Sequence, residues 1–345
     1  MSTQEEYIEK VRKYCDSYEE TIQAMVSFDS AIRWEKGING YCKDTHFLPG
    51  RRMTKPDRTT VTPDIAIQMN HRYGIVGEVK ITANNNRDFG DAASQIEKYD
   101  DTLEGWKTTN GKINKHDLSL LVHSLHKVSA GRYFDSKKFS RNFTIIACAR
   151  ISQATETYMI EKYLGSFSDS NIDKKLSDVV GVPLEKVLAN FGTAKFCDQE
   201  PEYIEYTMNV IWMHIFGTIP KKEPRLVNGK RKEFIVADCN NITKTLKEQY
   251  SLSIPEQNQP TFPKKAWVKK SLDAFVEIGL AEQNENNSDQ YFINYTSRKK
   301  DSLLEVFAEK LHKAKQKKKE PSGKQLEFET LKQRDEPSSS DQEQI

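Results

Sequence analysis

Three residues in the first third of the chain have the types and spacing of a site that cleaves phosphodiester bonds. Asp64 and Glu78 supply carboxylates, and Lys80 follows Glu78 by two positions. Such cleavage needs a divalent cation that neutralises charge and activates water, and Mg²⁺ prefers oxygen ligands. We therefore expect Asp64, Glu78 and the main-chain carbonyl of Val79 to hold Mg²⁺, with Mn²⁺ as a substitute. Lys80 would orient or deprotonate the attacking water and offset the charge that develops on phosphorus.

Such ligands must be fixed on rigid elements, and the hydropathy pattern predicts two strands for them. Residues 64–69 and 73–81 alternate polar and apolar side chains around a short polar turn, which predicts a β-hairpin. Alternate residues of a strand point to opposite faces of a sheet. Asp64 on the first strand therefore shares a face with Glu78 and Lys80 on the second, and the three can converge.

A helix is predicted over residues 88–103, directly after the hairpin. Gln95 and Tyr99 lie four positions apart and so share one helix face. For this pair alone, a solvated face and a functional face are nearly equal alternatives. Apolar runs at 118–123 and 143–149 predict two buried strands. The order helix, hairpin, helix, strand, strand predicts an α/β sandwich with a mixed sheet.

These motifs together resemble the PD-(D/E)xK nuclease superfamily. The resemblance rests on Pro63-Asp64, on Glu78-Val79-Lys80 and on Gln95 with Tyr99, which looks like the Gln-x-x-x-Tyr motif of the RecB-like branch. It covers roughly residues 20–150. It implies a restriction-endonuclease-like αβββαβ core, and it implies that Gln95 belongs to a helix face that closes over the active site. A second Pro-Asp pair, Pro56-Asp57, is followed by no strand pattern.

Members of this superfamily often add an acidic residue from the first helix. Apolar spacing predicts one helix over residues 7–26 and another from about 30 to 36. The candidates in or near these helices stay open: Glu19, Glu20, Asp29 and Glu35. Asp29 is interpreted preferentially as the N-cap of the second helix. His123 and His126 are expected to be satisfied or exposed histidines rather than metal ligands.

Residues 201–298 resemble a winged-helix-like α+β domain. The pattern predicts helices over 204–219, 242–250 and 264–278, a basic loop over 221–232, and a strand over 290–295. In such folds the last helix enters the major groove and the wing contacts the backbone. Its basic residues are therefore expected to bind DNA phosphates: Lys264, Lys265, Lys269 and Lys270. Protein contact through the same surface is the alternative.

These patterns divide the chain into four parts. We expect a nuclease-like domain over 1–160, a helical connector over 161–200, the winged-helix-like domain over 201–298, and over 299–345 the end of a helix and a disordered, lysine-rich, polar tail. Within the tail, Gln325-Leu-Glu-Phe328 faintly resembles a sliding-clamp-binding peptide, and a disordered tail is the preferred interpretation.

The composition of the 345-residue chain favours a globular protein with some disordered sequence. Its 52 basic and 50 acidic residues nearly balance, so any nucleic-acid surface must come from local clustering. The five cysteines form no C-x-x-C pair, and no apolar run is long enough to span a membrane. We expect free thiols, a cytoplasmic location and no membrane partner.

Two functions follow as expectations. The first is a Mg²⁺-dependent deoxyribonuclease with a C-terminal DNA-binding domain, acting in restriction, defence or repair. The second is a non-catalytic DNA-binding regulator or adaptor that uses a nuclease fold as a scaffold, because no clear helix carboxylate is present. Either could form a homodimer or bind a protein partner through its C-terminal domain or tail.

Overall fold

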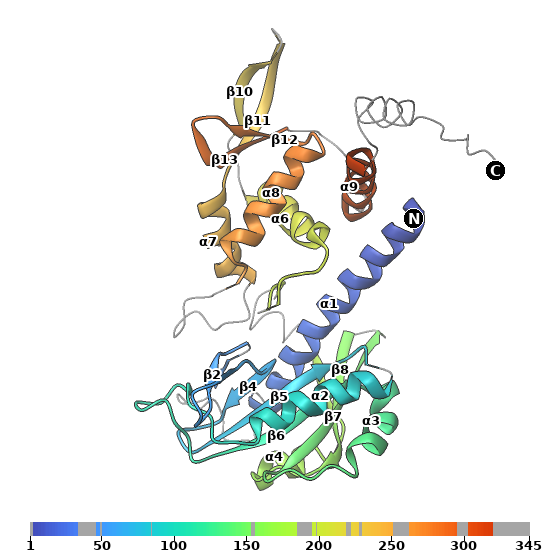
Figure 1. Cartoon of the computed structure of the whole chain (residues 1–345), viewed down its shortest axis with the longest axis vertical. Coiled ribbons are helices and arrows are strands. Elements are labelled where there is room, and N and C mark those ends of the chain that lie inside the picture. Colours follow the sequence, from blue (N-terminus) through green and yellow to red (C-terminus); the bar gives the residue numbers. More distant parts are fainter. Residues whose placement is uncertain are drawn as a thin grey trace, which may run out of the picture.

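The computed structural model describes residues 3–33, 46–48, 50–83, 85–152, 156–184, 195–197, 199–218, 222–227, 230–250, 262–294 and 303–319. Figure 1 shows two groups of elements, a large mixed sheet with its helices below and a smaller antiparallel sheet with its helices above. Helix α1 (Gln4–Arg33) runs from one group to the other. The chain is therefore a mixed α/β protein, as the sequence predicts.

The larger sheet has seven strands in the order β1-β4-β5-β6-β7-β8-β9. Its middle strands β5, β6 and β7 are parallel, and the strands on either side pair antiparallel. The predicted mixed sheet is thus confirmed. The strand bounds are β1 (His46–Phe47), β4 (Ile65–Gln68), β5 (Tyr73–Lys80), β6 (Lys115–His123), β7 (Phe143–Ser152), β8 (Glu156–Gly165) and β9 (Val180–Pro183), with a separate hairpin of β2 (Met53–Thr54) and β3 (Thr60–Val61).

Helices cover both faces of this sheet. On one face, Ile75 and Val79 of β5 belong to the same core cluster as the apolar side chains of α1. On the other face, Ala66 and Val76 pack in a second cluster with α2 (Asn86–Tyr99) and α3 (Lys127–Phe134), which follows the short 3-10 helix η1 (Ser124–His126). Neighbouring residues of the predicted hairpin therefore enter opposite cores, which confirms its alternation.

Side-chain caps fix the two elements that carry the candidate site. The Asn70 side chain accepts hydrogen bonds from the amides of Arg72 and Tyr73, at 2.8 and 2.9 Å, and so closes the β4–β5 turn. Asn85 is the N-cap of α2 and accepts from the amides of Arg87 and Asp88. Both the hairpin and the start of α2 are therefore encoded locally.

The first helix differs from the prediction at its C-terminal end. α1 continues without a break to Arg33, so the prediction of a second helix that begins near Ser30 is wrong. Asp29 lies inside α1 with none of its surface exposed, and it is not an N-cap. The remainder of the second predicted helix, including Glu35, lies outside the described residues. The reason is burial: the last two turns of α1 are buried on all sides, which favours one continuous helix.

The prediction of a helical connector over 161–200 is also wrong. β8 and β9 fall in or across this range and extend the large sheet, with the short helix α4 (Ser170–Lys175) between them. Tyr158 and Ile160 of β8 are buried while their neighbours are less so, which is the period of a strand. The first unit therefore extends beyond residue 160.

The smaller sheet has four antiparallel strands in the order β10-β11-β13-β12. The predicted helices and the strand near 290 are confirmed, whereas the predicted basic loop over 221–232 is wrong, because a strand pair occupies its described residues. The bounds are α6 (Ile204–Thr218), β10 (Lys222–Val227), β11 (Lys230–Asp238), α7 (Cys239–Tyr250), α8 (Lys265–Glu277), β12 (Ala281–Asn284), β13 (Asn287–Asn294) and α9 (Leu303–Lys319). α9 runs through the start of the predicted tail, and residues 325–328 lie outside the described part.

The N-terminal half of α1 joins the second group of elements. Its side chains contact α6 and α9, and Figure 1 shows α9 beside this end of the helix. The Tyr7 hydroxyl donates to Glu205 Oε1 at 2.5 Å, and the Tyr18 hydroxyl donates to the carbonyl of Gln199 at 2.9 Å. α1 is therefore part of both cores.

Two findings concern the expected environment of the chain. Within the described ranges, no helix combines the length and the apolar character that a membrane span requires. Four of the five cysteines are buried free thiols, and Cys42 lies outside those ranges.

Candidate active site

Asp64, Glu78 and Lys80 come together where β4 and β5 pair. Asp64 directly precedes β4, and the pairing of Ile65 with Gly77 sets Asp64 beside Glu78. The Val79 amide donates to Asp64 Oδ2 at 2.9 Å, so the backbone of β5 fixes this carboxylate. Lys80 Nζ lies 3.3 Å from Glu78 Oε2. The predicted convergence of the three side chains is present.

The expected face of α2 packs directly on Glu78. The Tyr99 hydroxyl donates to Glu78 Oε1 at 2.6 Å. With its amide oriented to satisfy the hydrogen-bonding partners, Gln95 donates through its side-chain nitrogen to both Glu78 oxygens. Behind them, buried His116 Nε2 lies 2.5 Å from the Tyr99 carbonyl and secures the end of α2. The solvated-face alternative for Gln95 and Tyr99 is therefore wrong.

The two carboxylates share a site from which water is largely excluded. Only 1% of Glu78 is exposed, and burial, followed by the nearby Asp64 carboxylate, raises the pKa of Glu78 to about 8. Lys80 and the Tyr99 hydroxyl act in the opposite direction on this pKa. Burial also raises the pKa of Asp64, while the Val79 amide and Lys80 oppose that rise. The pair therefore holds a proton that exposed carboxylates would release.

A divalent cation fits this donor set. Two carboxylates held side by side in a poorly solvated site repel each other, and a cation between them would offset that repulsion. Their oxygens are the donor type that Mg²⁺ and Mn²⁺ prefer. Across the described ranges, no group of three or more His, Cys, Asp and Glu side chains could hold a metal ion. Asp64 and Glu78 would therefore bind it with help from water, and the Val79 carbonyl stays a prediction.

Among the helix-borne candidates, Glu19 and Glu20 have neighbours away from this pair, and Glu35 lies outside the described residues. Glu19 accepts from Lys195 Nζ at 2.5 Å, and Glu20 lies near Cys148 and Tyr158, at β7 and β8. Asp29 is buried within α1, which covers the opposite face of the sheet from α2. The described contacts of Asp64 and Glu78 come from β4, β5 and α2.

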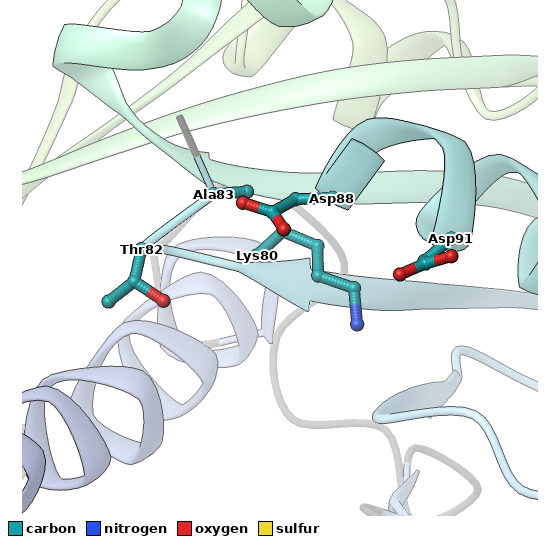
Figure 2. Close-up of a pocket in the computed structure, with 5 residues that line it drawn as sticks. All are labelled: Lys80, Thr82, Ala83, Asp88 and Asp91. Atoms are coloured by element: carbon teal, nitrogen blue, oxygen red, sulfur yellow. The ribbon is translucent and has the colours of Figure 1, made fainter. Parts of the chain in front are cut away.

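A pocket of about 220 Å³ opens beside Lys80. It is lined by Lys80, Thr82, Ala83, Asp88 and Asp91, and Figure 2 shows the two aspartates of α2 beside the Lys80 side chain. Asp88 and Asp91 are not among the site residues that the sequence predicts. Their spacing of seven and four residues from Gln95 on one helix could have indicated them. Lys80 is the positive group of an otherwise acidic opening.

The other candidates have structural partners. His123 Nδ1 accepts from the amide of Leu125 at 3.2 Å and caps η1, so its role is local. Asp57, of the second Pro-Asp pair, accepts from the amide and hydroxyl of Thr59 in the β2–β3 turn. Neither contributes to the Asp64–Glu78 site.

The four lysines expected to bind DNA lie on or beside α8, and each contacts this chain. Lys265 and Lys270 form ion pairs of 2.6 Å with Asp289 and Glu200. Lys269 Nζ donates to the carbonyl of Ser288 and to the Tyr291 hydroxyl, at 3.0 and 2.9 Å. The Lys264 ammonium lies 5.8 Å from the centre of the Trp267 ring. All four lysines therefore already have contacts within this chain, which phosphate groups would have to compete with or replace.

No protein-family model, curated protein or solved structure matches this chain. What the site does must therefore be inferred from its own residues and their geometry.

Proposed function

We propose that the chain is a metal-dependent nuclease that hydrolyses phosphodiester bonds of DNA. One observation carries this proposal: Lys80, Gln95 and Tyr99 converge on a buried carboxylate pair, Asp64 and Glu78, from two different elements. Buried carboxylates with raised pKa values beside a cationic side chain are typical of functional sites, because such an arrangement is costly to a fold.

The order of elements supports the same proposal. Apart from the separate β2–β3 hairpin between β1 and β4, the elements α1, β1, β4, β5, α2 and β6 follow in the order αβββαβ, with β1, β4 and β5 antiparallel and β6 parallel to β5. This is the core that the resemblance to PD-(D/E)xK nucleases implies. In the second unit, the order α6-β10-β11-α7-α8-β12-β13 resembles that of a winged helix with β10 added before its first strand, which supports a role for this unit in positioning DNA.

Each side chain has a role that its contacts suit. Bound Mg²⁺ or Mn²⁺ would neutralise phosphate charge and activate water. Asp64 and Glu78 would hold the cation, and Lys80 would orient the attacking water and offset charge on the phosphoryl oxygens. Gln95 and Tyr99 would fix the Glu78 carboxylate, since both donate to it. Asp64 and Lys80 are partly exposed, whereas Glu78 is buried. DNA would therefore approach the site from the side of Asp64 and Lys80.

The test is cleavage of plasmid, linear duplex and single-stranded DNA with Mg²⁺, Mn²⁺ or EDTA. The Lys80→Ala variant is compared with Lys98→Ala, which removes an exposed lysine of α2. We expect metal-dependent cutting by the wild type and Lys98→Ala, and a loss of about 10²–10³-fold in Lys80→Ala. Equal rates for the two variants would remove Lys80 from the proposal.

A second candidate is a DNA-binding regulator without catalytic activity, and the contacts of Glu78 favour it. Both of its oxygens already accept hydrogen bonds from Gln95, and Tyr99 and Lys80 contact one oxygen each. A carboxylate so fully engaged could serve the fold alone. Tight, sequence-specific binding with no turnover under any metal would support this candidate, whereas equal affinity for all sequences would oppose it.

A further inference from the structure

The surface expected to bind DNA has no excess of positive charge. Over residues 264–294, which cover α8 and the hairpin β12–β13, four lysines face five acidic residues: Asp273, Glu277, Glu282, Glu285 and Asp289. Three of these lysines form ion pairs with carboxylates: Lys265 with Asp289, Lys269 with Asp273 and Lys270 with Glu200. Because binding to a phosphate backbone depends on uncompensated positive charge, this surface is a weak candidate for it.

A different segment of the same sheet concentrates basic residues. Residues 224–232 contain four basic residues and no acidic one: Arg225, Lys230, Arg231 and Lys232. They belong to β10 and β11, whose register sets Arg225 opposite Lys232, Leu226 opposite Arg231 and Val227 opposite Lys230. The basic residues thus lie within three successive pairs at the end of one hairpin.

This end of the hairpin stands apart from the rest of the sheet. β13 pairs with β11 from Phe234 onward, so the part of β11 before Phe234 pairs, among the described strands, with β10 alone. Figure 1 shows the two strands projecting beyond the sheet. We call this two-stranded part, residues 224–227 and 230–233, the basic ribbon.

The charge pattern of the basic ribbon is costly for the fold. Like charges at directly opposed positions destabilise a strand pair, and Arg225 opposes Lys232. Basic residues can also protect an edge strand from pairing with another chain. Within the ribbon both strands have an unpaired edge, because β11 before Phe234 pairs, among the described strands, with β10 alone. Edge protection therefore accounts for basic residues on either strand, but only a polyanionic partner would also offset the repulsion between like charges at the Arg225–Lys232 pair.

We infer that the basic ribbon is the surface through which the C-terminal unit binds the phosphate backbone of duplex DNA. A two-stranded ribbon fits the major groove of B-form DNA, and the four residues of each ribbon strand span about 13 Å. The choice of DNA as the polyanion rests on the proposed nuclease function. α8 then contributes packing through Trp267, Leu272 and Phe275 rather than the main phosphate contacts.

The test removes four positive charges from each of the two surfaces in turn. In the cleavage-deficient Lys80→Ala chain with EDTA, one variant replaces Arg225, Lys230, Arg231 and Lys232 with Thr, which suits strands. The matched variant replaces the four lysines at 264, 265, 269 and 270 with Gln. Fluorescence anisotropy of a short labelled duplex is measured against salt concentration, and circular dichroism checks that both variants fold.

Loss of four phosphate contacts should reduce the slope of log K against log salt by about 3 to 4. We expect this reduction in the ribbon variant and an unchanged slope in the α8 variant. Conversion of Arg225 and Arg231 to Lys keeps the charges and should keep the slope, which guards against an effect of misfolding.

Tighter binding to an RNA duplex, loss of binding in the α8 variant alone, or equal slopes in the two variants would each overturn the inference. This assay measures DNA binding by a chain that does not cleave DNA. Its outcome for the basic ribbon is therefore independent of whether the proposed nuclease activity exists.

Discussion

Glu78 is the residue whose environment says most about the site. It is buried beside a second carboxylate, and yet two neutral donors and one ammonium point at it. Desolvation alone would favour a protonated, inert acid, whereas these donors favour the ionised form. The balance keeps the group close to its point of ionisation at neutral pH, where a cation can replace the proton.

This balance predicts how stability depends on pH. The pKa of Glu78 is about 8 in the folded chain against 4.5 for an exposed glutamate. Between those values the folded protein holds a proton that the unfolded chain has released, so the free energy of unfolding should fall as pH rises toward 8. His116, whose pKa burial lowers to about 4, acts in the opposite sense, but only below its ordinary value of 6.5.

Thermal unfolding in EDTA between pH 6.5 and 8 isolates the carboxylate pair from His116. We expect the melting temperature to fall across this interval in the wild type and to stay nearly level in Glu78→Gln. Mg²⁺ at a hundred times its dissociation constant should restore about 2.7 kcal/mol to the wild type. An equal slope in both proteins would show that Glu78 does not titrate as its surroundings indicate.

At the scale of elements, the close approach of β5 to β6 holds the site strand in place. A Cβ at Gly77 would lie 2.2 Å from Ser119 Oγ and 2.3 Å from the Ser119 carbonyl oxygen. We therefore expect Gly77→Ala to lower the free energy of unfolding by about 1–3 kcal/mol or more.

Urea unfolding would measure this effect, with Gly90→Ala as the matched control. In α2, a Cβ at Gly90 meets only the Tyr133 hydroxyl, at 3.3 Å, and alanine favours a helix over glycine by about 0.5–1 kcal/mol. Gly90→Ala should thus be neutral or stabilising. A Gly77→Ala chain as stable as the control would mean that β5 can move away from β6.

The elements that the sequence predicts well are those with strong local signals. The β4–β5 hairpin has alternation and an Asx turn, and α2 has an apolar stripe and an Asn85 cap. The strand β8 has no such signal, because its charged residues obscure the alternation that Tyr158 and Ile160 begin. The β10–β11 hairpin has a recognisable signal in Asn228-Gly229, a strong two-residue turn sequence, but its run of lysines and arginines is more typical of a loop.

The candidate site divides in the same way. The alternation of side chains along a strand is enough to place Asp64, Glu78 and Lys80 on one face of the sheet. The helical spacing of four residues is enough to group Gln95 with Tyr99. The contact of that helix face with Glu78 depends on how α2 packs across the sheet, which local spacing does not specify. The pairing of the α8 lysines with Asp289 and Glu200 is likewise a tertiary property.

At the scale of the whole molecule, α1 connects the two groups of elements. Its N-terminal half contacts α6 and α9, and its C-terminal half contacts the large sheet. The hydroxyl of Tyr7 donates to Glu205, a carboxylate with none of its surface exposed. Removal of this donor leaves a buried acceptor poorly satisfied, which costs about 1–3 kcal/mol.

We therefore expect Tyr7→Phe to destabilise the chain, and to do so chiefly in the C-terminal group of elements. Hydrogen exchange resolved by peptide would detect this as faster exchange in α6 and α9 than in β5 and β6. Tyr203→Phe is the control, since its ring lies 6.0 Å from that of Tyr7. Uniform acceleration in all four elements would mean that the two groups unfold as one unit.

The measurement that tests the central claim most directly uses the two Pro-Asp pairs of the chain. Cleavage of DNA with Mg²⁺ is compared for the wild type, Asp64→Asn and Asp57→Asn. Asp57 caps a turn, and Asp64 lies beside Glu78. We predict metal-dependent cutting by the wild type and by Asp57→Asn, and a loss of about 10²–10³-fold or more in Asp64→Asn. Cutting by Asp64→Asn at the wild-type rate, or no cutting by any of the three proteins, would contradict a nuclease site built on Asp64, Glu78 and Lys80.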